Sequence, residues 1–247
     1  MIVGNLRGKR VLVENTADAS TLRNKGFVGR NLGQKLSLDL ISSLHLLRKK
    51  KLEIRRGEDV LTPGEIEGMM TDEERKAAVA YHFLKDKGIK PMMRGKNLVV
   101  SNSKVLIFRD DEMIDFSSQI TKSCFLCIED WEGNCLLYTV TRLPFAGSKP
   151  NGNKKGKKRG RTGLIKAIIE DSGMRIESGF KYGCQYRIYD GNSSHAKFLM
   201  TSADRVSSRD IVVRARVAQS VRKVLVQAAR GRGRKNFKFF AIKWVRV

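Results

Sequence analysis

Residues 186–198 read "YRIYDGNSSHAKF", and this stretch decides how the second half of the chain is interpreted. Alternating residues precede Asp190-Gly191 and apolar residues return after the serines, which predicts two short strands joined by a polar turn. Tyr189 and His195 then stand at the two ends of one turn. Both side chains can move protons where a rigid sheet ends, so the hairpin is the first candidate for chemistry, with an incidental histidine as the plain alternative.

The residues that follow this hairpin show two further patterns. Residues 214–231, "RARVAQSVRKVLVQAARG", have helical spacing, and Gly231 would end such a helix. Its apolar side is formed by Val217, Val221, Val224, Leu225 and Ala228. Lys223 lies on the same predicted helix. Residues 237–247, "FKFFAIKWVRV", predict a final strand that is apolar on both faces, which favours a central position or coverage by another chain.

The overall charge indicates the class of partner. The 247 residues contain 49 Lys and Arg against 25 Asp and Glu, giving a net charge of +24. An excess of this size usually serves a polyanion, either nucleic acid or an anionic membrane surface, although a merely soluble basic surface is the alternative. The chain has no run of 18 apolar residues and no signal-peptide core at its start, so we expect a soluble, cytoplasmic protein with no membrane partner.

The four cysteines are too few for a disulfide scaffold in a chain of this length. Cys124 and Cys127 have a spacing that zinc sites use, but no second pair of this kind follows, and the surrounding "KSCFLCIED" is apolar and strand-like. Buried thiols are the better account. We therefore predict no metal and no cofactor.

The first half reads as strands and helices in alternation. Strands are predicted around residues 9–15 and 51–57, with a helix over 33–50 between them. A second helix begins at the capping box Thr71 to Glu74 and ends at Gly88. Strands are then expected at 97–102, 104–110, 124–130 and 135–143. His45 and His82 fall on the two helices, and we interpret both as structural.

The chain contains an internal duplication. In both halves a helix ends at glycine, Gly88 or Gly173, and the chain then passes through a turn with glycine into a strand. We predict an α/β (α+β) fold of small mixed sheets with flanking helices. The first, degenerate copy is placed at 1–117, with a small subdomain at 1–65 and a truncated core at 66–117. The second, catalytic copy is placed at 118–247, with its core at 164–247.

Three residues of the second copy suit metal-free cleavage of RNA. RNA supplies its own nucleophile, the 2′-hydroxyl, so an enzyme needs a base, an acid and a positive charge for the phosphorane. His195 fits the acid and Lys223 the charge. Tyr189 fits the base only if nearby cations lower its pKa; the cations available are Arg187, Lys197, Arg216 and Arg222. A metal-dependent nuclease that takes a carboxylate from "RIESGFK" is the alternative.

Four stretches of the second copy make a resemblance specific. "GFKYGCQYRIY", "HAKFLM" and "RARVAQSVRKVLVQAA" with a closing "AIKWVRV" resemble the C-terminal nuclease region of the archaeal tRNA-intron splicing endonucleases. The likeness covers most of residues 164–247 in the family's order. "GFVGR" and "KLSLDLISSLHLLRKKKLEI", within residues 1–65, resemble the same family's small N-terminal subdomain. The resemblance implies a C-terminal nuclease domain of the restriction-endonuclease-like type.

The resemblance also implies a mechanism and an assembly. Tyr189 is the general base, His195 the general acid and Lys223 the stabiliser of the transition state, and the products are 2′,3′-cyclic phosphate and 5′-hydroxyl ends. By motif position, Arg216 and Arg246 are the arginines that sandwich a flipped bulge base. A chain with one degenerate and one complete copy works as a homodimer of four units. The substrate is the bulge-helix-bulge of precursor tRNA, and no DNA partner is expected.

Two charged clusters complete the list of predicted contacts. Further contacts to RNA phosphates are expected from Arg222, Lys197 and the basic tract at 149–162 with its Lys154, Lys155, Lys157 and Lys158. That tract is also consistent with a charged spacer. An acidic cluster is either a solvated turn or, by the resemblance, a loop that inserts into a basic pocket across the interface; its members are Asp110, Asp111, Glu112 and Asp115.

Two functions without catalysis fit the same composition. A non-catalytic RNA-binding or assembly subunit explains the charge without using the hairpin residues. A general basic RNA chaperone predicts binding with no site-selective cuts. Both leave Tyr189, His195 and Lys223 without a chemical role.

Overall fold

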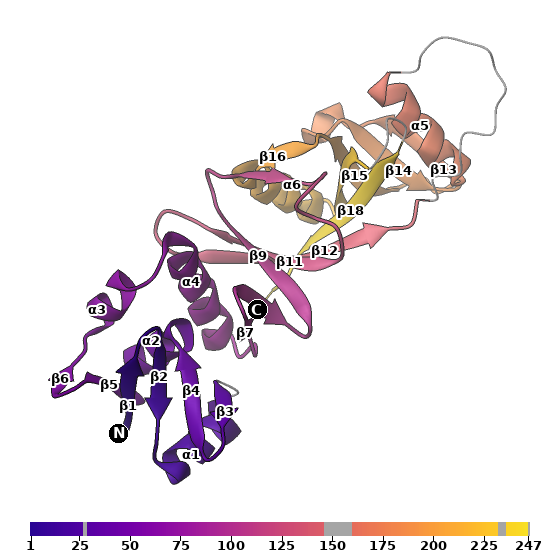
Figure 1. The fold of residues 1–247 in the computed structure, drawn as a ribbon. Coiled ribbons are helices and arrows are strands. Elements are labelled where there is room, and N and C mark those ends of the chain that lie inside the picture. Colours follow the sequence, from indigo (N-terminus) through magenta and orange to yellow (C-terminus); the bar gives the residue numbers. More distant parts are fainter. Residues whose placement is uncertain (27–28, 146–159, 232–235, 247) are drawn as a thin grey trace. The chain divides into compact units, whose positions relative to one another are not determined.

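The computed structural model describes residues 1–26, 29–145, 160–231 and 236–246 (Figure 1). The chain divides into two compact units. One contains Met1–Ile107 with Glu132–Cys135, and the other contains Phe108–Trp131 with Leu136–Val247. Both combine helices with sheets, so the mixed α/β fold predicted from the sequence is confirmed.

The first unit opens with a six-stranded sheet in the order β3-β4-β2-β1-β5-β6. Its strands are β1 (Ile2–Arg7), β2 (Arg10–Val13), β3 (Arg30–Leu32), β4 (Lys35–Asp39), β5 (Leu52–Arg56) and β6 (Asp59–Val60). The helices of this region are α1 (Thr16–Gly26), α2 (Leu40–Arg48) and α3 (Pro63–Gly68). The strands predicted at 9–15 and 51–57 therefore exist as β2 and β5.

The helix predicted over residues 33–50 is wrong in its first part. Residues 35–39 form β4, which pairs antiparallel with β2, and the helix begins only at Leu40. Asp39 makes the break, because its carboxylate accepts a 2.8 Å hydrogen bond from the Ser42 N–H and caps the helix. Leu36 and Leu38 lie on alternate strand positions, and both are fully buried.

A helix and three antiparallel strands follow in the first unit. These are α4 (Asp72–Asp86), β7 (Met92–Arg94), β8 (Asn97–Val100) and β9 (Ser103–Arg109). The predicted capping box is present, since Thr71 accepts from the Glu74 N–H and Glu74 accepts from the Thr71 N–H. The helix stops before Gly88, whose φ of +74° is a conformation that glycine adopts without strain.

The second unit is built on strands in the order β13-β14-β15-β17-β18-β12-β11. They are β11 (Cys124–Glu129), β12 (Cys135–Leu143), β13 (Met174–Ser178), β14 (Tyr186–Asp190), β15 (Ala196–Ser202), β17 (Val224–Arg230) and β18 (Phe237–Trp244). A separate pair joins β10 (Met113–Asp115) to β16 (Arg205–Ser207). The remaining elements are α5 (Arg161–Asp171), the short 3-10 helix η1 (Phe180–Tyr182) and α6 (Ser208–Ser220). Because β18 lies between β17 and β12, its predicted central position is confirmed.

The helix predicted over residues 214–231 is also wrong in its second part. The helix α6 ends at Ser220, and residues 224–230 form β17, which pairs parallel with β15. Parallel neighbours need a crossover connection, and α6 provides it. The apolar residues assigned to a helix face therefore divide between two elements, with Val217 on α6 and Val224, Leu225 and Ala228 on β17. Lys223 does not lie on a helix.

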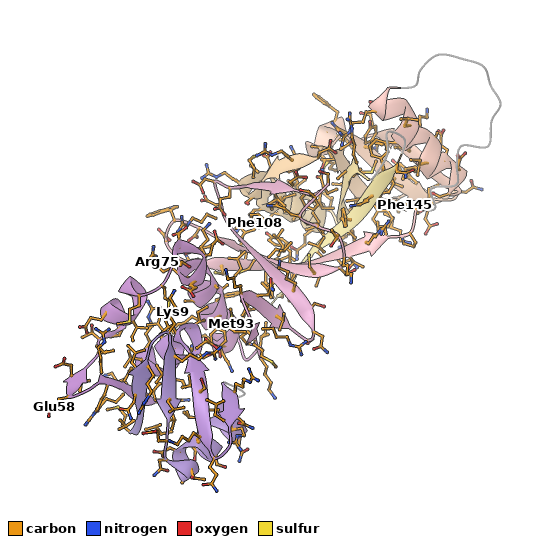
Figure 2. The ribbon with its side chains drawn as sticks, in the orientation of Figure 1. Lys9, Glu58, Arg75, Met93, Phe108 and Phe145 are labelled. Atoms are coloured by element: carbon orange, nitrogen blue, oxygen red, sulfur yellow. The ribbon has the colours of Figure 1, made fainter. Side chains whose placement is uncertain are left out.

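The core of the second unit forms where α5 covers the sheet. Ile165, Ile168 and Ile169 of α5 pack with Ile188, Phe198, Met200, Val226, Ala228 and Phe239 of the strands. Phe145, which follows β12 and is labelled in Figure 2, lies edge-on to Phe239 at a centroid distance of 5.1 Å. This packed layer holds β14, β15 and β17 side by side, and the ends of these three strands carry the candidate catalytic residues.

The two halves of the chain repeat one order of elements. The series α4-β7-β8-β9-β10-β11-β12 matches α5-β13-β14-β15-β16-β17-β18, except that α6 has no counterpart between β10 and β11. Equivalent strands also pair with each other, since β12 pairs antiparallel with β18 and β10 with β16.

None of the helices in the described residues is long and apolar enough to cross a membrane.

Candidate active site

The predicted hairpin is present and carries an irregularity at the tyrosine. Strands β14 and β15 pair antiparallel, and Gly191 turns the chain with a φ of +52°. Tyr189 pairs with Ala196, whereas Ile188 pairs with Phe198, so the register shifts between the two. A bulge of this kind adds one residue to a strand and re-aims the neighbouring side chains. It lies next to the residue expected to act as base.

The ends of three strands bring the predicted catalytic residues to one edge of the sheet. Tyr189 is near the end of β14, His195 immediately precedes β15 and Lys223 immediately precedes β17. Phe198 pairs with both Ile188 and Val224, which aligns these three ends. Residues separated by up to 34 positions in the sequence are therefore neighbours in the fold.

The backbone beyond α6 determines where Lys223 sits. The Lys223 N–H donates to the Ala218 carbonyl at 2.8 Å, and the Arg222 N–H donates to the Gln219 carbonyl at 2.9 Å. These two bonds form a Schellman motif, which needs a left-handed residue at the position of Arg222. Arg222 adopts that conformation with a φ of +56°, although it is not glycine. The motif turns Lys223 out of the helix and into the start of β17.

Tyr189 is enclosed by charged side chains. Only 5% of the residue is exposed. The Arg175 guanidinium lies 4.1 Å from the centre of its ring and that of Arg187 lies 5.7 Å away. Burial raises the pKa of Tyr189, and the nearby Glu177 carboxylate raises it further, while the two arginines oppose this rise only in part. Of the cations named as able to lower this pKa, Arg187 does so, but its effect is smaller than that of burial and Glu177.

His195 is exposed at the other end of the turn. Its N–H donates to the Ser193 Oγ at 3.3 Å, and the same Oγ–H donates to the His195 carbonyl at 3.1 Å. These bonds orient the backbone and leave the imidazole open to solvent. An accessible imidazole can meet a large polyanionic substrate without rearrangement of the fold.

Glu177, the carboxylate of the metal-nuclease alternative, is paired with two arginines. One carboxylate oxygen pairs with Arg175 and the other accepts from the Arg187 Nη2 at 3.0 Å. No group of three possible ligating side chains gathers anywhere in the described residues. Glu177 thus lies between two arginines beside Tyr189, an arrangement that the sequence did not indicate.

The predicted RNA contacts lie around the same sheet edge or on α6. Arg222 and Arg216 are exposed, and so is Lys197, which pairs with Asp190 at 2.8 Å. Arg246 is exposed beyond β18, with its guanidinium 5.8 Å from the centre of the Trp244 ring. Four predicted lysines lie outside the described residues, namely Lys154, Lys155, Lys157 and Lys158.

The acidic cluster makes contacts within its own unit. The Asp110 carboxylate accepts from Arg209 at 2.8 Å, and the Glu112 carboxylate accepts from the Arg109 N–H at 2.8 Å. Asp115 accepts from Ser117 and Ser118, and these hydrogen bonds lower the pKa of its carboxyl. These contacts hold the turn on either side of β10. The acidic cluster also includes Asp111. Docking of this cluster into another chain stays a prediction.

Two family models match the chain. The model described as the tRNA intron endonuclease N-terminal domain matches residues 2–67, and the model of the catalytic C-terminal domain matches residues 166–237. Together they cover more than half of the sequence. The chain belongs to the tRNA intron endonuclease family. The catalytic model contains Tyr189, His195 and Lys223 within its matched range.

Curated relatives of the family come from archaea. The tRNA-splicing endonuclease of Pyrococcus horikoshii is 38% identical over 82 residues, which cover 30% of this chain and 48% of the relative. That of Thermococcus gammatolerans is 31% identical over 87 residues, covering 34% and 51%. That of Methanopyrus kandleri is 35% identical over 65 residues, covering 24% and 36%. The chain thus spans about half or less of the length of these relatives.

Proposed function

We propose that this chain of the tRNA intron endonuclease family cuts precursor tRNA at bulge-helix-bulge exon–intron junctions. The observation that carries the proposal is the alignment of the ends of β14, β15 and β17, which gathers a phenol, an imidazole and an ammonium at one sheet edge. The net charge of +24 suits a polyanionic substrate. As a place of action we propose the cytoplasm.

The reaction uses the nucleophile that RNA carries. Tyr189 removes the proton of the 2′-hydroxyl, and the 2′-oxygen attacks the adjacent phosphorus. Lys223 lies beside the phosphorane and stabilises its negative charge. His195 donates a proton to the departing 5′-oxygen. The products are a 2′,3′-cyclic phosphate and a 5′-hydroxyl, and no step uses a metal ion.

Exposed arginines account for recognition of the bulge. Bases that are not stacked in a helix bind well between guanidinium planes, and this contact tolerates different sequences. We assign this role to Arg216 and Arg246, and we expect Arg222 and Lys197 to contact phosphates. Arg246 follows β18, whose end lies at the same sheet edge as the start of β17, because Leu225 pairs with Ile242.

The repeated order of elements supports a two-copy chain. Strands β11 and β12 hold the positions in the first copy that β17 and β18 hold in the second. This favours ending the first copy after β12, at residue 143, and not at residue 117. The antiparallel pairing of β12 with β18 joins the two copies. Two such chains form a homodimer of four units.

The decisive experiment incubates the purified protein with a bulge-helix-bulge RNA in excess EDTA. Two cuts are expected, with cyclic phosphate and 5′-hydroxyl ends, from a species whose sedimentation corresponds to two chains. Activity that EDTA abolishes, or 3′-hydroxyl ends, contradicts the mechanism. A monomer that cuts contradicts the assembly and leaves the chemistry in place.

A pair of variants separates catalysis from binding. His195→Ala is expected to lower the cleavage rate by roughly a hundredfold or more, which is the usual contribution of a general acid, with RNA affinity retained. Asn192→Ala, an exposed change in the same turn, is the matched control and keeps the wild-type rate. A wild-type protein that binds the RNA tightly and never cuts it identifies a non-catalytic subunit instead.

A further inference from the structure

Tyr189 has a difficulty as a base that acts alone. An ordinary phenol has a pKa of about 10, so roughly one molecule in a thousand is ionised at neutral pH. In this structure burial and the contact with Glu177 raise the pKa of Tyr189, which makes the phenolate scarcer still. A mechanism that waits for the free phenolate therefore loses about a thousandfold in the population of active enzyme.

The strand pair β13–β14 surrounds Tyr189 with a set of charges. Arg175 pairs directly with Tyr189, and Glu177 pairs directly with Arg187. Alternate strand residues share a face, so all four side chains lie on the same side of the hairpin. Tyr189 and Glu177 are diagonal neighbours on this face, a spacing that aromatic and long side chains can bridge. The Glu177 carboxylate raises the pKa of the Tyr189 hydroxyl, and each carboxylate oxygen is bound by one arginine.

Arg175 joins this cluster to the turn that carries His195. Its guanidinium lies 4.1 Å from the centre of the Tyr189 ring, and its Nη2 donates to the Ser193 carbonyl at 3.1 Å. Ser193 in turn exchanges hydrogen bonds with the backbone of His195. One arginine thus contacts the phenol on one strand and the turn that holds the imidazole.

We propose that Glu177 is the proton acceptor behind Tyr189, which turns the tyrosine from a free phenolate base into a relay. The inference rests on the proposed function, because it concerns the same cleavage reaction. As the 2′-oxygen attacks phosphorus, the 2′-hydroxyl proton passes to the Tyr189 Oη, and the Oη–H proton passes to the Glu177 carboxylate. The bond to the 5′-oxygen breaks as His195 supplies that oxygen with a proton.

The protons balance in this step. Tyr189 is a neutral phenol before and after it, Glu177 gains one proton, and His195 loses one. Exchange with water then resets both groups. Because a carboxylate is ionised throughout the neutral range, the relay needs no rare ionisation state. Glu177 does not touch the substrate, so it is a positioning and proton-accepting residue that acts through Tyr189.

A purely structural role for the cluster is the competing account. Strand β13 is an outermost strand of its sheet, and charged side chains commonly protect such strands from pairing with other chains. A structural role predicts that loss of Glu177 lowers activity by the same factor at every pH. The relay predicts a factor that changes with pH, and this difference decides between them.

The test compares wild type with Glu177→Gln on a bulge-helix-bulge RNA in EDTA across a neutral to alkaline pH series. Glutamine can still accept a hydrogen bond but takes no proton. At neutral pH the variant is expected to cleave roughly a hundredfold more slowly, with KM unchanged. It must then rely on the phenolate, so the ratio of the two rates shrinks about tenfold for each pH unit gained. Any step that is the same in both proteins cancels from the ratio.

Three further variants make the result specific. Glu177→Asp keeps a carboxylate and is expected to recover part of the rate with the wild-type pH profile. Combining Glu177→Gln with Tyr189→Phe is expected to cost no more than Tyr189→Phe alone, because both act on one proton path. Glu170→Gln on α5, which removes an exposed Glu–Lys ion pair away from the hairpin, is the control for loss of a surface carboxylate and leaves rate and profile unchanged.

The outcomes separate the relay from the function beneath it. A ratio that stays constant across the pH series, or a Glu177→Gln enzyme as fast as wild type, overturns the relay while cleavage itself stands. A wild-type protein that never cuts the RNA overturns the proposed function and the relay with it. Thermal melting of Glu177→Gln checks that the ratio is measured on folded protein.

Discussion

The Nδ1 atoms of His45 and His82 lie 3.0 Å apart, where α2 packs against α4. Such a contact needs one Nδ1 to donate and the other to accept, so the two rings cannot both be protonated. Desolvation, followed by the partner ring, lowers the pKa of His45 to about 4, and desolvation lowers that of His82 as well. The positive charges of Lys49 and Arg48 oppose protonation of these imidazoles, whereas the Asp86 carboxylate favours it.

The first prediction concerns stability in acid. Unfolded histidines titrate near pH 6.5, so between that pH and the folded value of about 4 the unfolded chain binds more protons. The free energy of unfolding of the first unit should therefore fall as pH falls from about 7 to about 5, by about 2 kcal/mol after allowance for solvent screening. Urea unfolding at several pH values measures this slope. His82→Gln should flatten it, whereas His195→Gln, in the exposed turn, should not.

The second prediction concerns Lys223. Because its backbone is held by the Ala218 carbonyl, truncation of the side chain leaves the turn intact. Lys223→Ala should lower the cleavage rate by roughly a hundredfold or more, as loss of a charge that stabilises a transition state does, with unchanged melting temperature. Single-turnover cleavage measures the rate. Lys166→Ala, at an exposed site on α5, is the matched control, and an equal loss there points to general charge effects.

The third prediction isolates the backbone at Arg222. Its φ of +56° suits glycine and is costly for a β-branched residue. Both Arg222→Gly and Arg222→Val remove the same charge, yet the valine variant should be less stable by about 1–2 kcal/mol. Valine should also slow cleavage more than glycine does, since strain there displaces Lys223. Equal stabilities contradict the Schellman geometry.

The fourth prediction concerns Gly179, the first glycine of "GFKYG". A Cβ at this position would lie 2.8 Å from the carbonyl carbon and oxygen of Tyr186. Backbone cannot move aside as a flexible side chain can, so Gly179→Ala should cost about 1–3 kcal/mol in stability and distort the hairpin that holds Glu177. Thermal unfolding measures the loss. Gly64→Ala in α3, with no atom within 4 Å of the added Cβ, should be neutral or stabilising.

Local signals predicted several elements well. Asp190-Gly191 marks a hairpin because glycine accepts a positive φ there, and the hairpin is found. Thr71 and Glu74 mark a helix start because each satisfies a free N–H of the other, and both bonds are present. Such signals work because the interaction partners are only a few residues apart, so the sequence contains the whole interaction.

The two failures differ in kind, because Asp39 is a local helix-start signal within residues 33–50, whereas no glycine marks the end of α6. Residues 33–50 were predicted as one helix because Leu36, Leu40 and Leu44 share helical spacing, while Asp39 divides them between β4 and α2. Residues 214–231 lack a glycine where α6 ends, so the helix was extended to Gly231. Arg222 takes the strained conformation because β17 gains pairing with both β15 and β18.

The sequence by itself determined which reactive groups the chain carries. It showed a strongly basic chain, a hairpin with Tyr189 and His195 at its ends, and a lysine further along the chain. The tertiary structure decided how those groups are arranged, by bringing Lys223 to the sheet edge and by placing Glu177 and Arg175 around the phenol. The reason is physical. Strand register and parallel pairing depend on the packing of distant segments against one another, and the pKa of a tyrosine depends on which charges that packing brings beside it.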